Sequence, residues 1–105
     1  MQACTRPELK LMFAIPNGGQ RHIAVANKLR QEGVKAGIPD LMLAVGRGPY
    51  HGLFIEMKAG KNKPTAKQQE WIESLRRQLY FVEVCRSFDE ARLLIEWYLD
   101  EIENE

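Results

Sequence analysis

The chain has 105 residues, of which 45% are hydrophobic and 28% are charged. These values are typical of a globular protein and argue against intrinsic disorder, and the length suffices for one core without disulfides or a structural metal. No apolar run approaches the roughly 20 residues of a membrane span, and no signal-peptide pattern opens the chain. The two cysteines, Cys4 and Cys85, lack CxxC spacing and are expected to be free thiols in a reducing compartment.

The formal net charge of +1 conceals an uneven distribution. Residues 21–67 contain nine Lys and Arg against three Asp and Glu, a net charge of +6. Residues 88–105 contain seven acids and one base. A basic region beside an acidic tail fits a surface that binds a polyanion, and it fits a chance asymmetry on a solvated surface equally well.

The first half of the chain is predicted to contain a helix and an antiparallel hairpin. Residues 9–15 are expected to form a strand that ends at the turn sequence PNGG, followed by a helix over 20–32 that Gly33 caps. LMLAV at 41–45 is apolar on both faces, as in a central strand. GRGP then turns the chain into LFIEM at 53–57, and residues 58–64 form a basic loop.

The second half is predicted to add two helices and a strand. Thr65 and Gln68 form a capping box that opens a helix to about residue 78, with Ile72, Leu75 and Leu79 on one stripe. Residues 80–84 form a strand, and Ser87 and Glu90 form a second capping box. The inward face of the last helix is expected to carry Phe88, Ala91, Ile95, Leu99 and Ile102. This order of elements predicts one α/β domain over residues 1–105, a small mixed β-sheet flanked by helices.

Strand periodicity gathers charged residues at one end of the hairpin. Alternation puts Leu53, Ile55 and Met57 on one face and Phe54, Glu56 and Lys58 on the other. If the chain turns near residues 46–52, Asp40 lies beside the far end of the partner strand. The sequence therefore predicts two carboxylates and one ammonium at the same end of the sheet.

Such a group suits metal-dependent hydrolysis of a phosphodiester. Two converging carboxylates repel each other unless a proton or cation intervenes, and oxygen ligands select a hard ion such as Mg²⁺. The ion polarises the phosphodiester and lowers the pKa of water, while a nearby ammonium neutralises developing charge. Two simpler interpretations stay open: Glu56 and Lys58 form an ordinary strand-end ion pair, and Asp40 after Pro39 caps a turn.

Several short motifs carry a family resemblance. GIPD followed by IEMK resembles the PD-(D/E)XK nuclease superfamily. More narrowly, PNGG, GVKAGIPDL, GLFIEMK and T-x-x-Q-x-x-W resemble, in this order, the virus-type replication-repair nuclease (VRR-NUC) domain over residues 8–99. The resemblance implies a restriction-endonuclease-like core and a Mg²⁺- or Mn²⁺-dependent DNA endonuclease, acting on branched DNA such as Holliday junctions or flaps in some members. It further implies an intracellular protein of the cytoplasm or nucleoid, or of a host cell if viral.

The resemblance also assigns roles to residues. Asp40 and Glu56 would be metal ligands with the carbonyl of Met57, and Lys58 would be the catalytic lysine. Gln68 matches the family's glutamine, a role compatible with its capping role. The candidates for DNA contact are Asn17, Gly18, Gly19, Arg21, Lys35, Lys61 and Lys63. The first three fit a plain strand-to-helix turn nearly as well.

The main departure from the family pattern lies at the start of the chain. The family usually opens with a helix that contributes a glutamate to the site. Here only residues 1–7 precede the first predicted strand, so that helix is expected to be missing, and Glu8 is not a convincing replacement. The first alternative to a nuclease is therefore a catalytically reduced DNA-binding module, and the second is a plain protein-interaction domain in which the Asp, Glu and Lys form surface ion pairs. Symmetric cutting of branched DNA favours a two-fold homodimer, with the last helix either at its interface or buried in the monomer.

Overall fold

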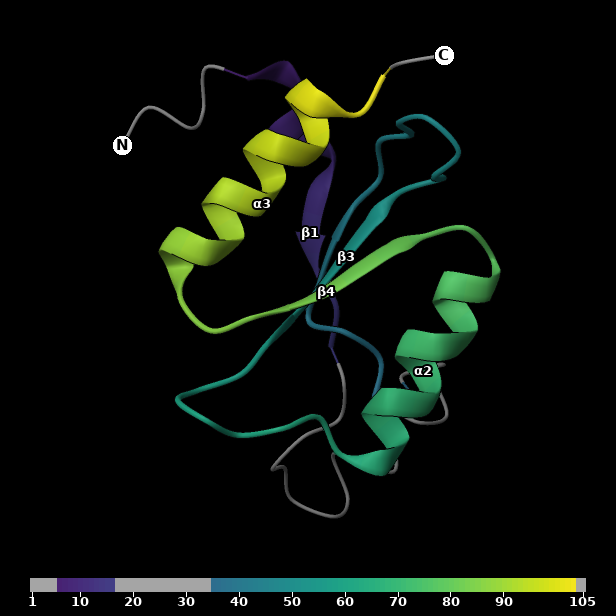
Figure 1. Ribbon diagram of the computed structural model, residues 1–105, viewed down its shortest axis with the longest axis vertical. Helices are drawn as coiled ribbons and strands as arrows, with labels where there is room; N and C mark the ends of the chain where they lie inside the picture. Colours follow the sequence, from purple (N-terminus) through teal and green to yellow (C-terminus); the bar gives the residue numbers. More distant parts are fainter. Residues whose placement is uncertain (1–5, 17–34, 104–105) are drawn as a thin grey trace.

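The computed structural model describes residues 6–16 and 35–103, which form a mixed four-stranded sheet between two helices. The strands are β1 (Met12–Ala14), β2 (Leu41–Leu43), β3 (Leu53–Met57) and β4 (Phe81–Cys85), in the spatial order β1-β2-β3-β4. The first two pairs are antiparallel, and β4 runs parallel to β3. Helices α2 (Ala66–Arg77) and α3 (Phe88–Glu101) lie on opposite sides of the sheet (Figure 1). The α/β prediction is confirmed, whereas the helix expected over 20–32 lies outside the described residues.

Alternation along β3 builds a core on each side of the sheet. Leu53 and Ile55 are buried against the α3 side, together with Leu43, Cys85 and Tyr98. Phe54 packs on the α2 side with Ile72 and Val82. The predicted two faces of this strand are confirmed, and Glu56 follows Phe54 by two residues on the α2 side.

The start of the described chain differs from the strand predicted over 9–15. A 3₁₀-helix occupies Pro7–Leu11, and the strand is shortened to Met12–Ala14. Pro7 stands in the first turn, where its fixed φ and missing N–H are tolerated, and the backbone N–H of Leu9 donates to the carbonyl of Arg6. The local preference of proline thus prevails over the apolar pattern that suggested a strand.

Helix α2 begins as predicted, but it ends at Arg77, before the last residue of the predicted apolar stripe. Both hydrogen bonds of the Thr65–Gln68 capping box are present. After the C-cap Gln78, Leu79 adopts φ +67°, and the N–H of Tyr80 donates to the carbonyl of Leu75 over 3.1 Å. This is a Schellman ending with leucine where glycine is usual. Leu79 is consequently 49% exposed, and its predicted place on the buried stripe is wrong.

Helix α3 is also partly different from its prediction. Ala91, Ile95 and Leu99 are buried as expected, but Phe88 is 90% exposed because the first turn extends past the end of β4 (Figure 1). Tyr98, absent from the predicted inward face, is fully buried and donates its hydroxyl to the carbonyl of Val45 over 2.7 Å. Strand β4 begins one residue later than predicted and includes Cys85. The Ser87 side chain accepts from Glu90 N–H, whereas the Glu90 carboxylate accepts from Arg86 N–H, so the second capping box is only half formed.

Candidate active site

The hairpin register fixes Asp40 beside the end of β3. Leu41, the first residue of β2, faces Ile55 in the antiparallel pair. Asp40, the residue before it, therefore lies opposite Glu56. The backbone N–H of Asp40 donates to the carbonyl of Ile55 over 3.0 Å. Its side-chain Oδ2 accepts from the N–H of Met57 over 2.8 Å. The predicted approach of Asp40 to Glu56 is therefore found, with both the backbone and the carboxylate of Asp40 held by β3.

Glu56 is a carboxylate inside the core. It lies on a central strand, between β2 and β4, and only 2% of its surface is exposed. Its Oε2 accepts from the side-chain amide of Gln68 over 3.4 Å. No donor group among the described residues forms a hydrogen bond to its buried Oε1, and the neighbouring group is the Asp40 carboxylate. A buried carboxylate oxygen without a partner carries a large desolvation cost, so this position is poorly suited to a purely structural role.

The surroundings of Glu56 disfavour its ionised form. Burial, together with the charge and hydrogen bonding of Asp40, raises the pKa of Glu56 to about 7, and the charge of Lys58 lowers it in part. The protonated form of Glu56 therefore persists to a higher pH than in an exposed glutamate. A cation at this position would favour the ionised form and relieve the repulsion between the two acids.

Lys58 follows β3 directly and is half-buried. Its backbone N–H donates to the carbonyl of Cys85 over 3.0 Å, which fixes the chain where it leaves the sheet. Its charge acts on Glu56, yet within the described part of the chain no ion pair joins their side chains. The ordinary strand-end ion pair, one of the two simpler interpretations, is therefore not what the structure contains.

Gln68 joins helix α2 to the central strand. Its side-chain oxygen accepts from the backbone N–H of Thr65 over 2.9 Å, as the capping box requires. Its side-chain nitrogen is the donor to Glu56 described above. The capping contact and the expected reach toward the site are thus both present, at the two ends of a single amide, and the catalytic role of Gln68 stays a prediction.

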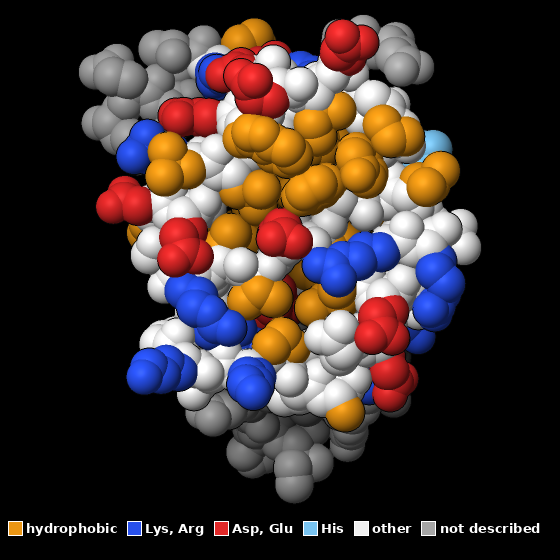
Figure 2. Space-filling view, viewed as in Figure 1, with side chains coloured by type: hydrophobic (Ala, Val, Ile, Leu, Met, Phe, Trp, Pro, Cys, Tyr) orange, Lys and Arg blue, Asp and Glu red, His pale blue; other side chains and the backbone are white. Residues whose placement is uncertain are grey.

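The candidates for DNA contact divide into two groups. Asn17, Gly18, Gly19 and Arg21 lie outside the described residues. Lys35, Lys61 and Lys63 are exposed. A Cβ at Gly37 would lie 2.6 Å from Cγ of Lys67, so the segment that follows Lys35 passes against the first turn of α2. Figure 2 shows several Lys and Arg side chains across the lower half of the viewed face, below the apolar side chains that gather beside α3.

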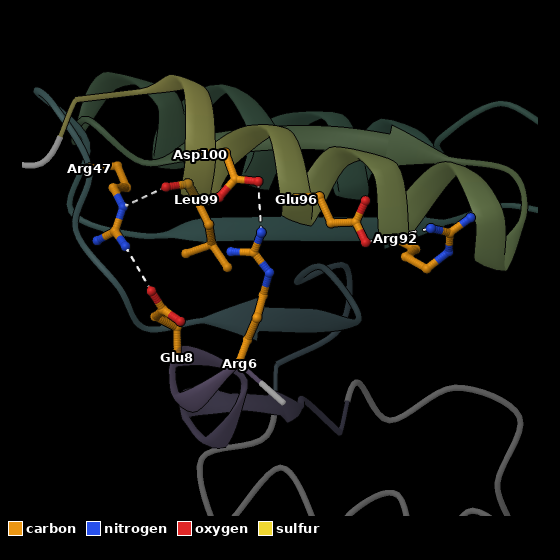
Figure 3. Close-up of polar contacts among 7 residues, drawn as sticks. All are labelled: Arg6, Glu8, Arg47, Arg92, Glu96, Leu99 and Asp100. Atoms are coloured by element: carbon orange, nitrogen blue, oxygen red, sulfur yellow. Dashed lines mark hydrogen bonds and ion pairs between the residues drawn. The ribbon is translucent and has the colours of Figure 1, made fainter. Parts of the chain in front are cut away.

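Glu8 does not join this site. Its carboxylate pairs with Arg47 over 3.2 Å (Figure 3). Arg47 lies in the turn between β2 and β3, at the opposite end of the hairpin from Asp40, and also donates to the carbonyl of Leu99 in α3. The expectation that Glu8 is no substitute for the family's helix glutamate agrees with this location.

Asp40 and Glu56 supply the oxygen atoms that a divalent cation could use at this end of the sheet. Among residues 6–16 and 35–103, no group of three or more Asp, Glu, His or Cys side chains is arranged to hold a metal. Two carboxylates do converge, and Oε1 of Glu56 is a buried acceptor in need of a partner. Mg²⁺ is commonly held by one or two carboxylates, with waters and substrate phosphate completing its shell. The residues present fit such an ion, and the carbonyl of Met57 as a third ligand stays a prediction.

Comparison with known proteins gives the family of this chain. A family model described as "VRR-NUC domain" matches residues 5–89, most of the chain. The chain belongs to the VRR-NUC family. A solved structure described as "VRR_NUC domain protein" is 34% identical, with a TM-score of 0.77 over 95% of this chain and 76% of that one. No curated protein gives a significant match.

Membership of the VRR-NUC family implies a nuclease-type function and DNA as the partner. Within the described residues, no helix is both long and apolar enough to cross a membrane. The sequence predicted Asp40, Glu56, Lys58 and Gln68 as site residues, and their catalytic and metal-binding roles stay predictions. Sequence reasoning missed Arg86, which contacts the lysine-containing loop after β3. Its position could have indicated this contact. Because β3 and β4 are parallel, Arg86, the residue after β4, lies beside Lys58, the residue after β3.

Proposed function

We propose that this VRR-NUC chain is a Mg²⁺- or Mn²⁺-dependent, structure-selective DNA endonuclease that hydrolyses phosphodiester bonds in branched DNA such as Holliday junctions or flaps. The observation that carries the proposal is the buried Glu56 carboxylate, with one oxygen lacking a partner among the described residues, beside Asp40. Two neighbouring carboxylates repel each other unless one binds a proton or both bind a cation, and this supports a cation site.

In this proposal each residue has a separate task. Asp40 and Glu56 hold the ion together with the carbonyl of Met57. An ion held there would supply Lewis-acid polarisation of the scissile phosphate and a lower pKa for water. Lys58 neutralises negative charge that develops on the phosphate, and Gln68 orients the carboxylate of Glu56 through its 3.4 Å hydrogen bond.

Recognition of DNA would depend mainly on phosphate contacts and on shape. A domain of 105 residues has little surface for reading base edges. The exposed Lys61 and Lys63 in the loop beyond Lys58, and Lys35 beside α2, are suited to bind the backbone. A two-fold homodimer belongs to the proposal, because it would present two equivalent sites to the two strands of a symmetric junction.

The test is a cleavage assay on labelled four-way-junction, flap and splayed-arm DNA in Mg²⁺, Mn²⁺ or EDTA. We expect cleavage of branched DNA by the wild-type chain in metal, and loss of at least about 100-fold in rate for Asp40→Asn and Lys58→Ala. Asp89→Asn is the matched control, because Asp89 is an exposed acid in the first turn of α3. Cleavage that persisted in EDTA or in both variants would contradict the proposal.

A catalytically reduced DNA-binding module of the same fold is the second candidate. It is favoured by one observation, that Glu8 pairs with Arg47 rather than joining the two carboxylates. Junction binding without cleavage in either metal would support this candidate. Cleavage that depends on Asp40 would exclude it.

A further inference from the structure

The loop after β3, residues 58–63, has a defined shape and carries three lysines, Lys58, Lys61 and Lys63. The Lys58 N–H is fixed to the carbonyl of Cys85, and the N–H of Asn62 donates to the carbonyl of Ala59 over 3.1 Å, which closes a tight turn. Gly60 adopts φ +54° within this turn, and a Cβ there would meet no atom within 4 Å. Backbone conformation, and not close packing, therefore calls for glycine at this position.

A single arginine from a distant part of the chain holds this turn. Nη1 of Arg86 donates to the carbonyl of Gly60 over 3.1 Å and also to the carbonyl of Asn62. Arg86 is itself fixed at the junction of β4 and α3, where its backbone N–H donates to the carboxylate of Glu90 over 2.9 Å. The turn is thus tied to the rigid end of the sheet by one side chain.

The charge of Arg86 is not neutralised by this arrangement. Carbonyl oxygens accept its hydrogen bonds, and across the two described segments no carboxylate forms an ion pair with it. Other arginines differ: Arg92 lies near Glu96 at 3.5 Å, and Arg76 near Glu83 at 3.3 Å. The exposed guanidinium of Arg86 therefore adds a full positive charge beside the three lysines of the loop.

We propose that Arg86 is a positioning residue for DNA binding: through the carbonyls of Gly60 and Asn62 it fixes the 58–63 loop so that its lysines meet the phosphate backbone together. This inference rests on the proposed action on DNA. A lysine on a mobile loop must lose loop and side-chain freedom on binding, whereas a loop already held in place loses less. Arg86 acts through the loop backbone, so its removal should weaken several phosphate contacts and not one.

The first arm of the test needs neither DNA nor metal. Amide hydrogen exchange is compared in the wild type, Arg86→Met, Arg86→Lys and the control Arg92→Met, whose ion pairs lie within α3. We expect exchange at Asn62 to rise about 10-fold in Arg86→Met, with the buried α3 residue Ile95 unchanged. Arg86→Lys keeps a charged donor and should therefore retain part of the protection at Asn62. The control Arg92→Met should retain all of it.

The second arm measures binding of a fluorescent four-way junction in EDTA, where metal-dependent cleavage does not proceed. We expect Arg86→Met to weaken binding about 10-fold and to reduce the slope of log affinity against log salt by more than about 1. Lys61→Gln should weaken the wild type about 3-fold and the Arg86→Met chain hardly at all, since interacting positions are non-additive.

Unchanged exchange at Asn62 in Arg86→Met overturns the inference, whatever the binding data give. Additive losses for Arg86→Met and Lys61→Gln overturn it too, because they would make Arg86 a separate phosphate contact. Failure of the wild-type chain to bind any junction contradicts the proposed function and the DNA part of this inference. The exchange arm still decides on its own whether Arg86 holds the loop.

Discussion

The side-chain amide of Gln68 donates a hydrogen bond to the buried carboxylate of Glu56 over 3.4 Å, while its oxygen accepts from the N–H of Thr65. One side chain therefore couples the start of α2 to the central strand of the sheet. It takes up Oε2 of Glu56, and Oε1 is left without a partner among the described residues. The first turn of α2 therefore helps to orient the carboxylate of Glu56, the candidate metal ligand.

Replacing Gln68 should impair the metal site more than the fold. We expect Gln68→Ala to raise the Mn²⁺ concentration for half-maximal cleavage about 10- to 100-fold, since residues that orient a ligand have effects of this size. Loss of half the capping box should cost about 0.5–1 kcal/mol in free energy of unfolding. Gln69→Ala is the control, because the side chain of the exposed Gln69 donates a hydrogen bond to Glu73 in the same helix. An unchanged Mn²⁺ requirement in Gln68→Ala would contradict the orienting role.

The raised pKa of Glu56 predicts how the stability of the metal-free protein depends on pH. The folded-state pKa of about 7 lies above the ordinary value of 4.5, so the folded state keeps a proton that the unfolded state releases. The free energy of unfolding should therefore fall as pH rises from about 4.5 to about 7, by about 1–3 kcal/mol, and level off above. Glu56→Gln removes this contribution, and urea unfolding in EDTA at pH 5 and pH 8 measures it.

The comparison with Glu56→Gln isolates one group from all other titrations. Wild-type stability should decline more steeply than that of the variant between the two pH values, and Mg²⁺ should restore the wild type at pH 8 without affecting Glu56→Gln. Parallel pH profiles for the two proteins would rule out a raised pKa at Glu56.

Much of this site could be predicted from the sequence because its determinants are local. The period of two along β3 separates Glu56 from Ile55 and Met57, and the hairpin register then brings Asp40 opposite Glu56. The capping box of Thr65 and Gln68 is equally local. What remained hidden depends on long-range packing: the contact of Arg86 with Gly60 requires the parallel pairing of β3 with β4 across an intervening helix.

The wrong predictions for Phe88 and Leu79 also result from long-range packing. Phe88 lies on the same helical stripe as Ala91 and Ile95, but the sheet does not extend beneath the first turn of α3. Leu79 continues the stripe of Ile72 and Leu75, yet the helix ends at Arg77 and turns through a left-handed residue. Periodicity identifies a face and does not locate where the partner surface stops.

The left-handed Leu79 offers a simple stability test. A non-glycine residue in this conformation is strained, and Leu79 is 49% exposed, so little burial is lost with its side chain. We expect Leu79→Gly to raise the free energy of unfolding by about 0.5–1 kcal/mol, even though glycine has more freedom in the unfolded chain. Thermal denaturation measures the change, with Leu79→Ala as the control that keeps a Cβ. Equal or lower stability of Leu79→Gly relative to Leu79→Ala would contradict the strain.

The buried hydroxyl of Tyr98 should matter for folding and not for cleavage. Its hydrogen bond to the carbonyl of Val45 is within the core, and Tyr98→Phe leaves that carbonyl without its partner. We expect a loss of about 1–2 kcal/mol in free energy of unfolding and unchanged cleavage at a temperature where both proteins are folded. Tyr50→Phe is the control, because Tyr50 is only half-buried. A loss in Tyr98→Phe no larger than in the control would show that this bond contributes little.

The most direct test of the central claim, that Asp40 and Glu56 hold a divalent cation, is anomalous diffraction from crystals soaked in Mn²⁺. We expect an anomalous peak within coordination distance of both carboxylates, with Oε1 of Glu56 as a ligand, and no such peak in Glu56→Gln crystals. A map with both side chains well ordered and no peak between them would contradict binding of a cation by this pair.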